Sequence, residues 1–133
     1  MNIKRWIWAS LAAFAALMIL DHPLHNMILT PYYSAMQQLW RPNMMSLMWI
    51  MLLSYLLMSF LFVFIFAQGY KGKGLMEGLR FGLIAGCFYQ IPHILSQYVV
   101  YPIPLGLTVG WVLGGLVEFA ACGLVVGAIY KGK

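Results

Sequence analysis

The sequence has very little charge. Aspartate and glutamate account for only 3 of the 133 residues, lysine and arginine for 8, and charged residues together for 8%. Soluble proteins contain roughly a quarter charged residues, so this chain cannot build an ordinary water-facing surface. Hydrophobic residues make up 63%, a proportion that suits lipid as the solvent and predicts an integral membrane protein with the bilayer as its first partner.

Cysteine and recognisable reaction motifs are also scarce. The two cysteines, Cys87 and Cys122, both lie inside apolar runs, which predicts buried free thiols and not a disulfide framework. Nothing in the sequence resembles a hydrolase triad or a dinucleotide fingerprint, so an enzyme is not supported. The net charge of +5 forms no basic stripe, and nucleic-acid binding is therefore not indicated.

Long apolar stretches take up most of the chain, over residues 5–29, 44–68, 75–99 and 105–130. As helices, all four are long enough to cross a hydrocarbon core about 30 Å thick. We therefore predict an all-α fold: one transmembrane domain over residues 1–133, built as a four-helix bundle.

The first stretch begins like a secretory signal, with Lys4 and Arg5 before an apolar run. No small-x-small cleavage site follows it; Asp21 and Pro23 come instead, which favours an uncleaved first span. Two outcomes are open after that point. Pro23 kinks a helix that continues to about Leu29, or Asp21 caps a short second helix.

The distribution of basic residues predicts the orientation of the chain. In the four-span arrangement one side of the membrane carries nearly all of them, and Arg41 alone falls on the other side. Cytoplasmic segments carry the excess of lysine and arginine, so both termini are expected in the cytoplasm. The residues on the cytoplasmic side are Lys4, Arg5, Lys71, Lys73, Arg80, Lys131 and Lys133.

Several short runs resemble a family of small, uncharacterised four-span bacterial inner-membrane proteins. They are residues 70–82 (YKGKGLMEGLRFG), 101–104 (YPIP), 114–118 (GGLVE) and 127–131 (GAIYK). The resemblance covers most of the chain and implies a multi-pass protein of the bacterial inner membrane. It implies no activity, and no role for any residue is carried over from it.

Glu118 is the most unusual residue in the apolar runs. It lies 12 residues before Tyr130, roughly 18 Å along a helix, and a charged carboxylate at mid-membrane costs about 2.5 to 3.5 kcal/mol. Gly110 and Gly114 share its helix face, so we expect Glu118 to face the bundle. It either forms a hydrogen bond with a neighbouring helix, in which case Glu118→Leu damages folding, or it binds an ion, proton or ligand.

A second polar group is predicted in the outer half of the membrane. Asp21 and His25 lie four residues apart on one helix face, and His93 reaches a similar depth on the third span. We predict that His25 and His93 face a common cavity with Asp21 and Gln90 at its floor. Such a group can hold a zinc-like metal, with His22 as a further candidate ligand, or two histidines can hold a haem. Alternatively, the histidines are interfacial and bond to backbone or water.

Two further patterns are worth testing. Met44, Met48 and Met51 share one helix face. Their thioethers could bind Cu(I); alternatively, the side chains only fill gaps in the packing. Glu77 and Arg80 are spaced three apart, which predicts an ion pair in the first turns of their helix.

Three classes of function are compatible with these features. The first is an accessory subunit that packs against a membrane-protein partner or a second copy of itself, favoured by minimal loops and glycine-rich faces. The second is a carrier or channel for a proton, metal ion or small solute, using Glu118 and the Asp21/His25/His93 group. The third is a haem- or metal-binding redox protein. The first needs no special chemistry, and the sequence alone favours it.

Overall fold

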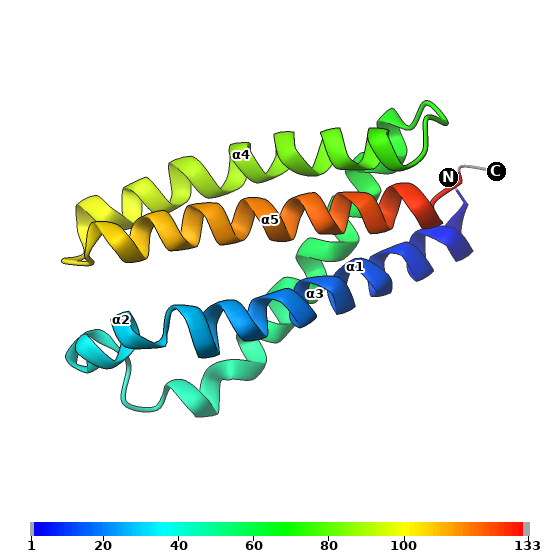
Figure 1. Ribbon diagram of the computed structural model, residues 1–133. Coiled ribbons are helices and arrows are strands. Elements are labelled where there is room, and N and C mark those ends of the chain that lie inside the picture. Colours follow the sequence, from blue (N-terminus) through cyan, green and yellow to red (C-terminus); the bar gives the residue numbers. More distant parts are fainter. Residues whose placement is uncertain (1, 132–133) are drawn as a thin grey trace.

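The computed structural model describes residues 2–131, and long helices dominate this part of the chain (Figure 1). The prediction of an all-α fold is confirmed. Among the described residues, three short helical elements lie between the first two long helices. In chain order the elements are α1 (Ile3–Pro23), the π-helix η1 (Leu24–Ile28), α2 (Thr30–Ala35), the 3-10 helix η2 (Gln37–Leu39), α3 (Met44–Gly69), α4 (Leu75–Val100) and α5 (Leu105–Ile129).

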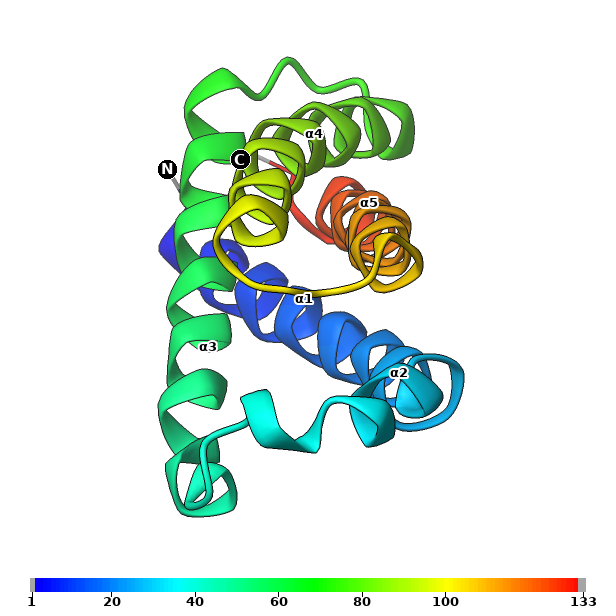
Figure 2. The ribbon, with the colours of Figure 1, turned by 90° about the vertical axis from the view of Figure 1, so that its left-hand side faces the viewer.

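The four long helices do not form a regular bundle. α4 packs along α5, while α1 packs against both α5 and α3. Figure 2 shows that α3 crosses the other helices at a steep angle. Its first half consequently has many exposed apolar side chains, including Met45 and Trp49.

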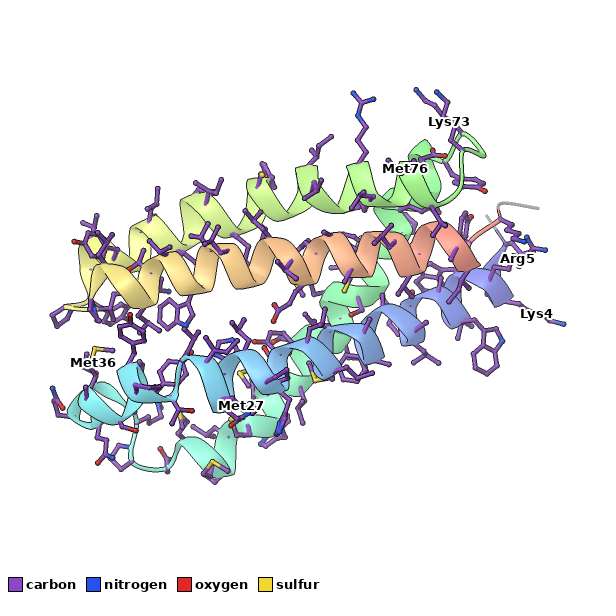
Figure 3. The ribbon with its side chains drawn as sticks, viewed as in Figure 1. Lys4, Arg5, Met27, Met36, Lys73 and Met76 are labelled. Atoms are coloured by element: carbon purple, nitrogen blue, oxygen red, sulfur yellow. The ribbon has the colours of Figure 1, made fainter. Side chains whose placement is uncertain are left out.

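Both described chain ends and the α3–α4 loop lie at one end of the molecule (Figure 1). The Arg5 guanidinium donates a hydrogen bond of 3.0 Å to the backbone oxygen of Lys131, which ties the two termini together. Lys4, Arg5 and Lys73 lie at this end, whereas Met36 lies at the opposite end (Figure 3). The molecule thus has one basic end.

The half of the molecule nearest the basic end is tightly packed. Glycines allow α4 and α5 to approach closely: a Cβ added to Gly78 would lie 2.8 Å from the Cα of Gly127. Beside this contact lies an aromatic core that includes Phe62, Phe66 and Tyr130. Small-residue contacts of this kind are typical of helices that associate in lipid.

Three helical segments are long and apolar enough to cross a membrane: Ile3–Ile28, Met44–Gly69 and Leu105–Ile129. Within residues 2–131, α4 is as long as α3 but is not one of these segments. Its Glu77, Arg80, Gln90, His93 and Gln97 make it more polar. The structure therefore supports a membrane protein with three strongly apolar helices.

The predicted ion pair between Glu77 and Arg80 is wrong. Within residues 2–131 Glu77 forms no ion pair, and its carboxylate accepts hydrogen bonds from the backbone N–H groups of Lys71 and Lys73, at 2.5 and 2.7 Å. Gly72 and Gly74, with φ of 81° and 67°, let the loop fold back over the start of α4. Charge-assisted bonds to backbone are stronger than an exposed ion pair, so Glu77 fixes the loop instead.

Candidate functional site

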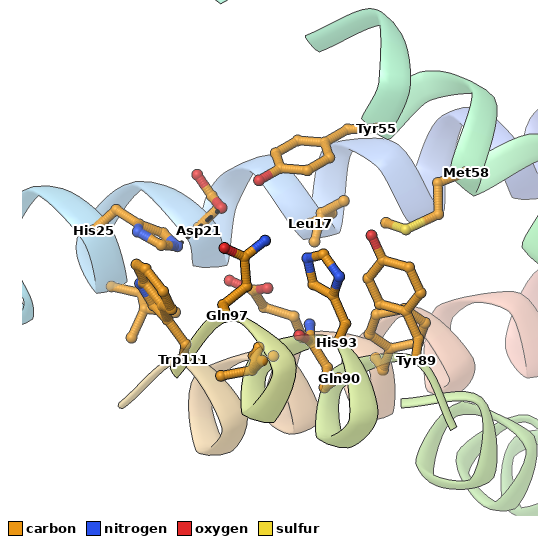
Figure 4. A pocket seen from close by; sticks show the side chains of 15 residues that line it. Leu17, Asp21, His25, Tyr55, Met58, Tyr89, Gln90, His93, Gln97 and Trp111 are labelled. Carbon is orange, nitrogen blue, oxygen red and sulfur yellow. Dashed lines mark ion pairs between the residues drawn. The ribbon is translucent and has the colours of Figure 1, made fainter. Parts of the chain in front are cut away.

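A polar cavity of about 310 Å³ lies among α1, α3, α4 and α5. Figure 4 shows Asp21 and His25 on its α1 side and Gln90 and His93 on its α4 side. Glu118 of α5 also lines it. The structure thus brings five residues singled out in the sequence to one cavity: Asp21, His25, Gln90, His93 and Glu118.

Three of these side chains form a compact group. Asp21, His25 and Glu118 each offer one oxygen or nitrogen, and these atoms all lie within 4.8 Å of one another. The Asp21 Oδ1 and His25 Nε2 atoms are 3.5 Å apart. Ligands bonded to one zinc ion at about 2.0 to 2.2 Å lie no more than about 4.4 Å apart, so small side-chain rotations would complete a three-ligand site.

Glu118 has an unused oxygen. The residue is only 6% exposed, and its Oε1 atom has no hydrogen-bond partner among residues 2–131. A buried polar atom without a partner costs about 1 to 3 kcal/mol. The predicted hydrogen bond between Glu118 and a neighbouring helix is therefore not formed at Oε1 within this part of the chain, and the oxygen is free to meet a ligand.

The first helix continues past Pro23, because α1 passes directly into the wider π-helical turn η1. Proline has no N–H to donate to the preceding turn, and the following turn is closed by a 2.9 Å bond from Leu29 N to Leu24 O, five residues apart. Short π-helical turns are frequent at functional sites. Here the turn carries His25, which keeps its place beside Asp21.

His25 is held by residues that the sequence did not identify as part of a site. Its Nδ1 lies 2.5 Å from the Tyr33 hydroxyl, which in turn accepts a 2.7 Å bond from Trp111 Nε1. Burial raises the pKa of Tyr33, against the opposing effect of the Trp111 hydrogen bond, so the phenol stays protonated. Tyr33 was not found by sequence analysis, because nothing in the sequence pairs a tyrosine with a histidine eight positions earlier.

This network also defines which His25 nitrogen can meet an ion. With Nδ1 directed at the Tyr33 hydroxyl, Nε2 faces Asp21. Orientation of a histidine ligand through its second nitrogen is the usual arrangement in metal sites. Binding of an ion at Nε2 requires the ring proton to sit on Nδ1, from which it is donated to the Tyr33 oxygen.

The remaining predicted residues take different positions. The His93 ring stacks on Tyr89, with centroids 5.6 Å apart, and lies outside the three-residue group. The Gln90 side chain of α4 packs against Gly115 of α5, where an added Cβ would lie 2.9 Å from the Gln90 Cγ. The absence of a side chain at Gly115 therefore lets the Gln90 amide reach the cavity. His22 is exposed and its ring contacts Asn26, so His22 does not join the three-residue group.

No protein-family model, no curated protein and no solved structure matches this chain. The fold and the cavity together define a helical membrane protein with a polar, carboxylate-bearing pocket. Its ligand has to be inferred from the geometry of that pocket.

Proposed function

We propose that the protein binds a divalent transition-metal ion, such as zinc, within the membrane. The observation that carries the proposal is the unpartnered Oε1 of Glu118, in a residue whose carboxylate lies within 4.8 Å of ligand atoms of Asp21 and His25. Carboxylate oxygens and imidazole nitrogens are ligands that zinc and similar ions accept. A haem held by His25 and His93 is less well supported, because the His93 ring stacks on Tyr89 and lies outside the group that contains His25.

We also propose that α4 is a fourth span and that both termini are cytoplasmic, in the inner membrane of a bacterium. The basic end supports this orientation, since cytoplasmic segments carry the excess of lysine and arginine. In this orientation the metal group lies in the outer half of the protein. The ion then enters from the outside.

Binding, and not open conduction, is the activity that the packing favours. Between the cavity and the basic end lie the aromatic core and the glycine contact between α4 and α5. An ion cannot pass this region unless the helices rearrange. The site therefore fits the binding step of a carrier better than the pore of a channel.

Metal titration of the purified protein tests the proposal. We expect zinc binding, measured by calorimetry in detergent, to weaken at least about 100-fold in His25→Gln and Glu118→Gln, since loss of even an outer-sphere partner costs about 10- to 100-fold. His22→Gln is the matched control: the same substitution, three residues earlier, at an exposed histidine. Equal binding by all four proteins, or no binding by the wild type, contradicts the proposal.

The accessory-subunit interpretation stays a prediction. Purification in mild detergent, followed by identification of the proteins that accompany the chain, tests it in the same preparation. A stoichiometric partner would support it, whether or not the chain also binds metal.

A further inference from the structure

A second cavity, of about 290 Å³, adjoins the first. The two share Asp21, His25, Tyr55 and Trp111. Two more aromatic side chains, Tyr33 and Trp40, and the thioethers of Met44, Met48 and Met51 complete much of its wall. The methionine face predicted from the sequence therefore borders an open space.

Three of the N–H groups on this wall already donate hydrogen bonds. Trp40 Nε1 donates to the backbone oxygen of Tyr33 at 3.1 Å, and Trp111 Nε1 donates to the Tyr33 hydroxyl. The Asn26 amide donates to the backbone oxygen of His22 at 3.0 Å. The donors that remain on it are the neutral hydroxyls of Tyr33 and Tyr55, which bind an anion more weakly than a charged donor does.

The charge of the wall also favours a cation over an anion. Among the described residues that line it there is no lysine or arginine, whereas Asp21 supplies a carboxylate. Aromatic side chains attract cations through their ring faces. A ligand with positive charge but no need for directed hydrogen bonds fits these walls.

We infer that this second cavity binds a small organic cation of the quaternary ammonium class, with Asp21 as the counter-charge and Trp40, Tyr55 and Trp111 as the aromatic walls. Its volume is close to the lower end, about 300 Å³, of small-molecule pockets and exceeds what one metal ion fills. Methionine supplies adaptable apolar walls of the kind used at permissive binding surfaces. The inference applies to the metal-free protein, because Asp21 belongs to both cavities and a metal ion bound to it would take up the counter-charge.

Choline and its neutral isostere, 3,3-dimethylbutan-1-ol, separate charge recognition from simple filling of the cavity. Both are titrated into full-length protein in phosphatidylglycerol nanodiscs and followed by tryptophan fluorescence. We expect saturable choline binding at least about tenfold tighter than that of the isostere. Asp21→Asn should abolish this preference. Equal binding of the two ligands, or no saturable response to choline, overturns the inference.

Matched variants locate the site. Trp40→Phe should weaken choline binding about three- to tenfold, whereas Trp49→Phe, at a residue 61% exposed on α3, should leave it unchanged. Glu118 lines the first cavity and, within residues 2–131, not the second. Glu118→Gln should therefore retain choline binding even though it loses zinc, so failure of one proposal is distinguishable from failure of the other.

Two further arms identify the occupant. Met48→Leu should retain choline binding, because leucine keeps the apolar wall. A different result would favour a soft-metal site. If the wild type binds silver(I) but does not respond to choline, and Met48→Leu loses the silver(I) binding, the inference is overturned. In phosphatidylcholine nanodiscs, a weakened response to free choline supports the lipid headgroup as the ligand; an unchanged response supports a free solute.

Discussion

Glu118→Leu should make the metal-free protein more stable while abolishing metal binding. The Oε1 atom of Glu118 is buried without a partner among residues 2–131, which costs about 1 to 3 kcal/mol. Leucine has a similar volume and needs no partner. We therefore expect the free energy of unfolding of the metal-free protein to rise by about 1 to 3 kcal/mol. The sequence alone predicted damage to folding, because it assumed a hydrogen-bonded partner for the carboxylate.

Added metal should reverse this ranking. A ligand present at 1,000 times its dissociation constant stabilises the folded wild type by about 4.1 kcal/mol, which exceeds the advantage of the leucine variant, and that variant gains nothing. Thermal unfolding in detergent, with EDTA and then with excess zinc, measures both effects. A change of 1 kcal/mol shifts the midpoint by roughly 3 to 6 °C for a chain of this size.

Thr108→Val is the control for burial alone. Thr108 is buried on the same helix, but its hydroxyl bonds to the Pro104 oxygen at 3.3 Å, so its replacement should not stabilise the protein. The reasoning is refuted if Glu118→Leu unfolds at a lower temperature than the wild type in EDTA. Such a result would mean that the carboxylate has a partner in the protein and is not waiting for an ion.

Three other predictions concern the support of His25, the packing of α4 on α5 and the membrane topology. Tyr33→Phe should weaken zinc binding about 10- to 100-fold, because it removes the bond that orients His25, whereas calorimetry of Tyr32→Phe should show no change. Gly82→Ala should lower the thermal midpoint, since an added Cβ would lie 3.1 Å from the Cα of Gly123; Gly69→Ala, where the space is open, should not. Reporter tags should place both termini in the cytoplasm and Gln37 outside, and an external C-terminus would contradict the four-span proposal.

The helices were largely predictable, but the angle of α3 was not. Apolar runs at 44–68, 75–99 and 105–130 differ by one residue at most from the ends of α3, α4 and α5, because charge and proline mark where each run stops. The direction of a helix depends on which of its faces meets a neighbour. α3 is apolar all round and so shows no preferred face in its sequence.

Asp21, His25 and Glu118 were predictable one by one, because polar groups in lipid are costly, but the approach of Glu118 to the other two was not. Counting residues put Glu118 near mid-membrane and Asp21 in the outer half, as two separate groups. In the structure α1 and η1 pack on α5 in a register that places the side chain of Leu24 against Gly114 and that of Leu29 against Gly110. This register brings Asp21 and His25 to Glu118, and nothing in the sequence pairs those leucines with those glycines.

One half of the molecule supplies most of the packing and the other half contains the cavities. This division explains why the fold tolerates a buried carboxylate oxygen without a partner. Glycine contacts and aromatic packing stabilise the half nearest the basic end, where both described termini meet. The other half contains the cavities and the π-helical turn. A cost of about 1 to 3 kcal/mol at Glu118 is tolerable when most of the packing lies elsewhere. Ligand binding would offset that cost, so we expect the half that contains the cavities to be the part of the protein that responds to an ion.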